Sequence, residues 1–380
     1  MPRAEMTSRE RILAAIRHEE PDRVPISPRV GAWMVAEYGD TSLAKQMEVL
    51  PLMDFMFITG EPAANYVYGT QTEYDLPDVD AEVTRRDAGD CYILERTFRT
   101  PAGSISDITR VPPPGREYGV SPNPVKSEHL VKSLDDLPAL EYILLPIPAS
   151  YDAHRPYEEM LGDRGIVMPC IRSALDHNAG DARGMENLMV DYYTDRALFD
   201  GVMDLFHQRS LAKAKACLEA GAGFIFGSWY YNSLSSGWSP AIFEEVFVPQ
   251  IREHVALAHS YGAIYDYYDD GVLAKSMGLI ASAGVDVLET CTPPPVGDFD
   301  LAEAKRTIGD RVTLKGYVDL LYVLKHGTPE LVERTVREAM EIAKPGGGFI
   351  IGSSDSFREG TPRENLDAYW RACVEYGRYD

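Results

Sequence analysis

Acidic, aromatic and a few basic side chains follow the short apolar runs of this chain, where the ends of neighbouring strands would bring them together. The set comprises Arg29, Glu61, Arg172, Asp176, His177, Trp229, Tyr230, Tyr231, Asn232, Tyr268, Asp269, Asp270, Glu289, Cys291, Tyr317, Asp319, Ser353, Ser354 and Asp355. A cleft of this composition suits a flat or apolar ligand and offers carboxyl groups for acid–base chemistry or cation binding. Among the histidines only His177 lies just past such a run, so a His-rich zinc site is not expected.

Three residues of this set are predicted to do the chemistry: Asp270, Glu289 and Tyr268. Strand alternation places Asp266, Tyr268 and Asp270 on one face, and Glu289 lies late in the next apolar run. Because adjacent strands lie about 5 Å apart, the two carboxyl groups should meet, and one pKa should be raised unless a cation lies between them. If a metal binds, we expect oxygen ligands from Asp266, Asp270 and Glu289.

The other polar and aromatic residues of the set are predicted to bind substrate: Arg29, Arg172, Asp176, His177, Trp229, Tyr230, Tyr231, Asn232, Tyr317, Asp319, Ser354 and Asp355. Structural roles remain as alternatives for several of them. Either Asp269 or Asp270 would suit the N-cap of the following helix. Glu289 could form an ion pair with Lys315 on the next strand, and the run Trp229-Tyr230-Tyr231 could simply close the top of the core.

The elements that would position these residues alternate between strand and helix. Apolar runs occur at 24–29, 55–60, 165–171, 223–228, 262–268, 285–290, 312–316 and 348–352, and most of the intervals from 165 onward carry helical periodicity, most clearly 329–343. This order predicts parallel strands in one (β/α)₈ TIM barrel, with a doubly wound open sheet as the alternative. Residues 91–110 predict a β-hairpin insertion. It lies within a stretch at about 75–150 that we expect to form an insertion or cap, and the whole chain, 1–380, is expected to form a single domain.

Composition limits the classes of partner. The chain has 380 residues, with 37 basic and 59 acidic side chains and a formal net charge of −22, so nucleic acids and anionic membranes are not expected partners. It shows no signal-peptide pattern and no apolar stretch of membrane-spanning length. Five cysteines without a CxxC motif favour reduced thiols and a cytoplasmic location. We also expect the chain to form a homo-oligomer, most simply a homodimer.

Both ends of the chain resemble the uroporphyrinogen decarboxylase superfamily. The similar segments are TSRERILAAIRHEEPDRVPI near the start, AGVDVLETCTPPPVGDFDLAEAKRTIGDRVTLKGYVD and GTPELVERTVREAMEIAKPGGGFIIGSSDSF in the last third, and TPRENLDAYW near the end. The resemblance implies a (β/α)₈ barrel with a cleft at the carboxyl ends of its strands. It also implies one of two chemistries, which are decarboxylation of uroporphyrinogen and methyl transfer involving a corrinoid or a thiol.

The sequence departs from the motifs of both branches. By the resemblance, uroporphyrinogen decarboxylases carry an Arg-rich segment of the type RxPxWxMRQAGR after the first helix. This chain reads DRVPISPRVGAW at that place, so Arg29 is the one arginine that could correspond to that segment. In the methyltransferase branch, the His-x-Cys zinc ligands fall on Tyr268 and Asp270, and the late Cys falls on Ser353 or Ser354. The zinc–thiolate site of that branch is therefore not expected here.

These departures favour a methyltransferase acting on a small methylated or aromatic substrate, since an aromatic cleft with few basic residues suits a polycarboxylate poorly. Through the resemblance, a corrinoid or tetrahydrofolate could accept the methyl group, and a corrinoid protein could be a partner. A decarboxylase (lyase) of a tetrapyrrole or other carboxylate is the alternative activity. A non-catalytic ligand-binding barrel is the alternative from another class of protein.

Overall fold

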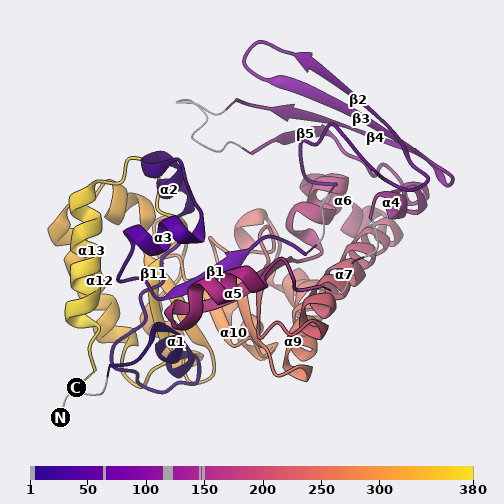
Figure 1. Cartoon of the computed structure of the whole chain (residues 1–380). Coiled ribbons are helices and arrows are strands. Elements are labelled where there is room, and N and C mark those ends of the chain that lie inside the picture. Colours follow the sequence, from indigo (N-terminus) through magenta and orange to yellow (C-terminus); the bar gives the residue numbers. More distant parts are fainter. Residues whose placement is uncertain (1–4, 63–65, 114–122, 145–146, 148–149, 380) are drawn as a thin grey trace.

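Seven parallel strands form a curled sheet in the order β1-β6-β7-β8-β9-β10-β11 (Figure 1). The computed structural model describes residues 5–62, 66–113, 123–144, 147 and 150–379. The strands are β1 (Phe55–Thr59), β6 (Gly165–Arg172), β7 (Phe224–Ser228), β8 (Ile264–Tyr268), β9 (Val287–Thr290), β10 (Thr313–Val318) and β11 (Phe349–Ser353). Each coincides with one of the predicted apolar runs, so the parallel α/β architecture is confirmed.

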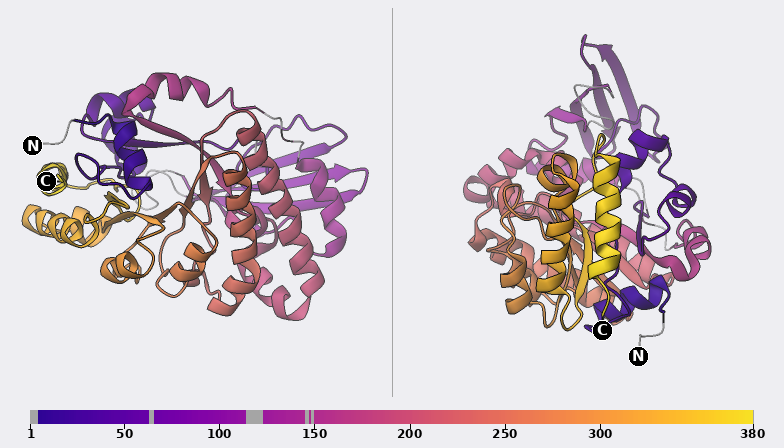
Figure 2. Two further views of the ribbon diagram at one scale, coloured as in Figure 1. Left: turned by 90° about the horizontal axis from the view of Figure 1, so that it is seen from below. Right: turned by 90° about the vertical axis from the view of Figure 1, so that its left-hand side faces the viewer.

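Helices cover the outer face of the sheet, and Figure 2 shows those of the C-terminal half in an arc around the strands. The α-helices are α1 (Ser8–Ile16), α2 (Gly31–Tyr38), α3 (Leu43–Val49), α4 (Leu137–Ile143), α5 (Arg155–Leu161), α6 (Met185–Thr194), α7 (Arg196–Glu219), α8 (Pro240–Ile242), α9 (Val248–Ser260), α10 (Met277–Ser282), α11 (Leu301–Thr307), α12 (Pro329–Ala343) and α13 (Arg363–Tyr376). Shorter or irregular helical segments are η1 (Leu134–Asp136), η2 (Gly162–Arg164), η3 (Leu175–Gly184), η4 (Leu234–Ser236), η5 (Phe243–Phe247) and η6 (Leu320–Lys325). Among the described residues, we find no helix that combines the length and the apolar character needed to cross a bilayer.

Two apolar clusters lie on opposite faces of the curled sheet. The smaller one fills the interior between the strands and includes Met56, Phe226 and Tyr268, with Ile12 and Ile16 of α1 closing the amino-terminal end. The larger one lies between the strands and the surrounding helices, where the predicted apolar stripe of α12 is buried. The strands therefore carry one set of side chains inward and the alternate set toward the helices.

The eighth predicted strand, at 24–29, differs from the expectation. Here the chain forms only a single parallel bridge, from Ile26 to Ile351, with Ser27 N donating to Ile351 O at 2.8 Å. On the other side, Asp54 N donates to Ile26 O at 2.8 Å, just before β1. Pro25 and Pro28 lack the N–H groups that a regular ladder needs, which explains the short pairing. The segment at 24–27 therefore lies as an irregular seam between β11 and β1.

A second, antiparallel sheet of four strands stands beside the barrel-like sheet, near α4 and α6 (Figure 1). Its strands are β2 (Asp80–Asp87), β3 (Tyr92–Thr100), β4 (Gly103–Val111) and β5 (Val125–Glu128). β3 and β4 pair in register around the turn at 100–103, within the stretch predicted to form a hairpin. Within the predicted cap, residues 114–122, 145–146 and 148–149 lie outside the described residues. That this region is an insertion into a single domain stays a prediction.

Candidate active site

Strand β8 sends alternate side chains to opposite faces of the sheet, as its sequence pattern predicts. Tyr268 belongs to the interior cluster, whereas Tyr265 and Tyr267 pack among the residues that face the helices. Asp266 lies on the interior side, where its carboxyl group interacts with Glu289. The interior of the barrel therefore contains ionisable groups as well as apolar side chains.

Glu289 forms a buried ion pair in this interior. It lies opposite Tyr268 in the register of β8 with β9 and opposite Lys315 in that of β9 with β10. The Nζ of Lys315 is 2.5 Å from Glu289 Oε2, and both side chains are almost fully buried. Burial, with Glu289 as neighbour, raises the pKa of Asp266 well above its ordinary range.

Arg29 lies across the top of this interior. Its guanidinium carbon is 4.2 Å from the ring centroid of Tyr268, and its Nη1 is 3.9 Å from Asp355 Oδ1. Burial opposes the charge, but Tyr268, Glu289 and Asp355 together raise the pKa of Arg29, so it remains a cation. Its buried Nη1 has no hydrogen-bond partner among the described residues. Arg29 therefore presents a positive group at the mouth of the barrel, which is the opening at the carboxyl ends of the strands.

Asp270 lies just beyond β8, at the same mouth. Burial and the nearby Asp355 raise its pKa to about 6, while Arg29 opposes this rise. The neighbouring Asp269 is fully buried and accepts a hydrogen bond from Asp270 N at 2.9 Å, so Asp269 takes the local structural role. Arg29 interacts electrostatically with both Asp270 and Glu289. The two predicted acids are thus linked through a cation.

A second acid, Asp176, enters the mouth from η3. Its Oδ2 accepts a hydrogen bond of 2.5 Å from Ser228 Oγ at the end of β7. Burial raises the pKa of Asp176 to about 6, against the opposing effects of Arg172 and His177. Two carboxyl groups near the mouth can therefore exchange protons close to neutral pH, which is the range that general acid–base chemistry requires.

Aromatic rings gather around His177. Its ring centroid lies 4.1 Å from that of Tyr68, 5.5 Å from Tyr231 and 5.9 Å from Tyr230. The Arg172 guanidinium carbon is 5.4 Å from the centre of the Tyr68 ring. Tyr68 was not among the predicted site residues, because the sequence around it has no strand or helix periodicity.

Several predicted substrate-binding residues lie away from this mouth. Trp229 donates its indole N–H to the hydroxyl of Tyr265 at 2.9 Å and stacks on Tyr267, so it faces the helix layer. Tyr317 also packs on that side, because Gly316 and Tyr317 have φ of 122° and 91° and interrupt the alternation of β10. The structure therefore places these two predicted substrate-binding residues on the helix-facing side of the sheet.

Three further residues support the loops at the mouth. Asp319 Oδ1 accepts from the backbone N–H groups of Leu321 and Tyr322, which caps η6. The hydroxyl of Ser354 accepts from Leu320 N at 3.2 Å. Asn232, fully buried, accepts a hydrogen bond from Ser173 and joins the ends of β6 and β7. Asp319 and Ser354 hold backbone in place and Asn232 binds a neighbouring side chain, roles that residue type and spacing do not distinguish from ligand binding.

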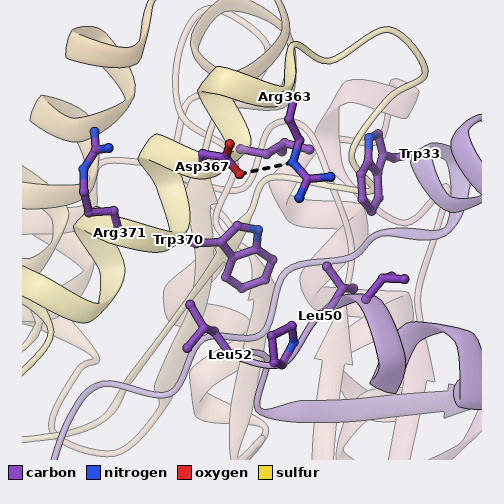
Figure 3. A pocket seen from close by; sticks show the side chains of 10 residues that line it. Trp33, Leu50, Leu52, Arg363, Asp367, Trp370 and Arg371 are labelled. Carbon is purple, nitrogen blue, oxygen red and sulfur yellow. Dashed lines mark hydrogen bonds and ion pairs between the residues drawn. The ribbon is translucent and has the colours of Figure 1, made fainter.

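Two hollows differ in their relation to this site. One pocket of about 230 Å³, beside the seam, is lined by Arg29, Lys315, Met56 and Ile58 among others, so it reaches the ionisable interior. The other, of about 320 Å³, lies on the outer surface between α13 and the segment after α3 (Figure 3). There Arg363 pairs with Asp367 at 3.2 Å. Of the ionisable groups described above, Arg29 and Lys315 border the first pocket, whereas Asp176 and Asp270 do not line it.

The donor groups at the family's zinc positions do not suit zinc. Tyr268 lies under the Arg29 guanidinium, and Ser354 hydrogen-bonds to backbone. Neither a phenol nor a serine hydroxyl is a ligand of the kind that holds zinc in thiolate sites. Within the part of the chain that the structure describes, His, Cys, Asp and Glu side chains nowhere form a group of three or more able to hold a metal ion.

The fold and the mouth define a barrel-like protein with polar and ionisable side chains at the carboxyl ends of its strands. The chain belongs to the uroporphyrinogen decarboxylase (URO-D) family, whose model matches residues 125–376. A solved structure described as a methyltransferase from Methanosarcina mazei superimposes with a TM-score of 0.64 at 17% identity, covering 98% of this chain and 99% of that one. This likeness confirms the coarser part of the fold prediction, an α/β fold with a curled, barrel-like parallel sheet.

Curated relatives give more specific comparisons. The chain is 28% identical over 204 residues to the methylated-thiol–coenzyme M methyltransferase of Methanosarcina mazei, covering 53% of this chain and 52% of that protein. It is 24% identical over 230 residues to the methylcobamide:CoM methyltransferase MtaA of Methanosarcina barkeri, covering 60% and 64% respectively. The match therefore spans about half the length of the first relative and less than two thirds of the second.

Proposed function

We propose that this chain is a methyltransferase that acts on a small methylated or aromatic substrate at the mouth of its barrel. The observation that carries the proposal is the pair of carboxyl groups, Asp176 and Asp270, whose pKa values are both raised to about 6. They lie in a mouth bordered by tyrosine rings and by Arg29 and Arg172. The two curated relatives, both named methyltransferases, support the same activity.

In the proposed reaction, the bond between the substrate's methyl carbon and a heteroatom breaks as the methyl group passes to an acceptor nucleophile. Asp270, in its acid form, donates its proton to the heteroatom that loses the methyl group and becomes a carboxylate. Arg29 orients an anionic part of the substrate, and the rings of Tyr230 and Tyr231 pack against its apolar part. Asp270, like Asp176, has a pKa raised to about 6, which is within the range useful for proton transfer near neutral pH.

The acceptor is proposed to be a corrinoid or tetrahydrofolate. The name of one relative includes methylcobamide, a methylated corrinoid, which supports a corrinoid as the group that carries the methyl, held by a partner protein. No step of the proposal uses a zinc ion, because the donor groups at the corresponding positions do not suit one. The region at about 75–150 is proposed to be a cap on a single barrel domain.

The test uses methylcobalamin and 2-mercaptoethanesulfonate as probes, followed by the cobalamin spectrum and by mass spectrometry of the methyl thioether. A second assay offers cob(I)alamin with methylated thiols and methoxylated aromatic compounds. We expect methyl transfer in at least one direction and its loss in Asp270→Asn. The control, Asp163→Asn, changes an exposed residue in η2, at the amino-terminal end of β6. A folded protein that transfers no methyl group in either assay would refute the proposal.

A further inference from the structure

The second sheet contributes to the mouth of the barrel through the segment that connects β1 to β2. Tyr68 lies in this segment, half-buried, with its ring 4.1 Å from that of His177. It also lies beneath the Arg172 guanidinium group. The segment has no regular secondary structure of its own around Tyr68, so contacts from elsewhere must fix its position.

Those contacts come from Arg96, a buried residue of β3. Its Nη1 donates to the carbonyl oxygen of Tyr66 at 3.0 Å and to the Tyr74 hydroxyl at 2.8 Å, and its Nη2 donates to the carbonyl oxygen of Val67 at 3.2 Å. The Nε and Nη2 groups also bind Asp107 of β4. All the N–H donors of the guanidinium are thus used in a fixed planar arrangement.

The charge of Arg96 is balanced inside the sheet. Burial opposes ionisation of Asp107, but Arg96 and Lys126 lower its pKa below the ordinary value. Lys126 Nζ lies 2.5 Å from Asp107 Oδ2. An ion pair that only stabilised the sheet would need no contact with the preceding segment. Three of the Arg96 hydrogen bonds nevertheless go to residues 66–74.

The chain after β5 provides a second connection, to η3. His129 Nδ1 lies 2.8 Å from the carbonyl oxygen of Asp181, and Val131 N donates to Ala182 O at 2.8 Å. Asp181 in turn contacts His177, with 3.0 Å between Oδ2 and Nδ1. The sheet and its flanking segments therefore contact the supports of both rings, Tyr68 on one side and His177 on the other.

We propose that the four-stranded sheet positions Tyr68 over the mouth, with Arg96 as the positioning residue, and that Tyr68 contacts the methyl-bearing part of the substrate. The positioning role stands on geometry alone. The substrate contact rests on the proposed methyl transfer. Tyr68 and His177 then form one wall of the mouth, and the groups with raised pKa values, Asp176 and Asp270, are the carboxyl groups of the same mouth.

The positioning role is tested by ¹⁹F NMR of the full chain with 3-fluorotyrosine at position 68. We expect Arg96→Lys to move this resonance toward the value of the unfolded chain, because an ammonium group cannot reach both backbone carbonyls and Asp107. Arg99→Lys is the matched control, since Arg99 lies on the same strand with its side chain exposed and paired to Glu82. A folded Arg96→Lys protein with an unchanged resonance would overturn the positioning role.

If Arg96→Lys does not fold, Tyr74→Phe replaces it, because it removes one acceptor of Arg96 without changing charge. A smaller shift in the same direction is then expected, and no shift would overturn the proposal.

The substrate contact is tested with the active assay. Tyr68→Ala should raise KM about tenfold with little change in kcat, as loss of one aromatic contact predicts. Arg96→Lys should raise KM in the same way, and the double variant should equal Tyr68→Ala because Arg96 acts through Tyr68. Additive effects, or a fall in kcat alone, would contradict the contact. A wild-type protein without methyl transfer would refute the proposed function and with it the substrate contact, and the ¹⁹F result would still decide the positioning role.

Discussion

Asp270 and Glu289 differ in what surrounds each carboxyl group, so their amide variants should behave differently. We expect Asp270→Asn to abolish methyl transfer without lowering the melting temperature at pH 7, because Asp270 is only partly buried and burial already disfavours its carboxylate form, as it does for Asp176. In the wild type, kcat/KM should fall as pH rises through about 6, where Asp270 loses its proton. The pH–rate profile and thermal unfolding of the variant measure both effects.

Glu289→Gln should instead destabilise the protein by about 3 kcal/mol, because it leaves the buried Lys315 charge without its partner. Denaturant unfolding of the variant, compared with the wild type, measures this loss. Activity retained by both amides, with only their melting temperatures lowered, would contradict the role assigned to Asp270 and leave Glu289 as a structural residue.

Asp176 gives a stability prediction with a defined pH range. Its pKa rises from the ordinary value of 3.8 to about 6, so the folded protein keeps this proton after the unfolded chain has released it. The associated stability is present below about pH 4 and is lost as pH rises through 6, roughly 3 kcal/mol for one such carboxyl group. Asp176→Asn should therefore be more stable than the wild type at pH 7 and similar at pH 4. Equal unfolding curves at pH 7 would contradict the raised pKa.

At the scale of elements, apolar periodicity predicted most of the parallel sheet. The seven runs that became strands are bounded by turns and carry alternating or continuous apolar side chains, which is the pattern of buried strands. The run at 24–29 has a similar composition, but Pro25 and Pro28 remove ladder donors, so only the bridge at Ile26 forms. Composition shows that a segment is buried, whereas pairing depends on each individual N–H group.

The same limit applies to the candidate site. On β8, regular alternation predicted the inward side of Tyr268, and the structure shows it there. On β10, the positive φ of Gly316 and Tyr317 turns the tyrosine outward, and no periodicity indicates this change. The sequence did not predict Tyr68 as a site residue, because the backbone on its N-terminal side is held by Arg96, which is remote in sequence. Residues held by distant contacts are those that sequence patterns miss.

In the seam at 24–27, where the backbone forms few ladder hydrogen bonds, the side chain of Asp54 supplies additional ones. Asp54 is fully buried, and its carboxylate accepts from Arg11 Nη1 and Arg23 Nη1, each at 2.6 Å, and from Ile26 N at 2.8 Å. Asp54→Asn should lower the free energy of unfolding by about 3 kcal/mol, since two arginines would lose their charged partner in a buried site.

The control for the seam is Glu48→Gln, which removes the exposed partner of Lys45 on α3 and should have little effect. Hydrogen exchange adds a local measurement, because the amide of Ile26 should lose protection in Asp54→Asn. An Asp54→Asn protein as stable as the wild type would mean that the seam holds without this carboxylate.

At the scale of the whole molecule, the charge of this chain suits a polyanionic substrate such as uroporphyrinogen poorly. The formal net charge is −22. The two cations near the mouth, Arg29 and Arg172, have the carboxyl groups of Asp176, Asp270 and Asp355 as neighbours. An octacarboxylate needs several charge-assisted contacts, and each nearby carboxylate of the protein opposes its binding. We therefore expect no conversion of uroporphyrinogen to coproporphyrinogen, measured by chromatography of the oxidised porphyrins under anaerobic conditions. Substituting Asp176 and Asp270 by Asn should not create the activity, because the missing arginines, and not only the two acids, prevent binding. Efficient turnover by the wild-type chain would overturn the assignment to methyl transfer, since the mouth would then hold a polyanion despite its acidic lining.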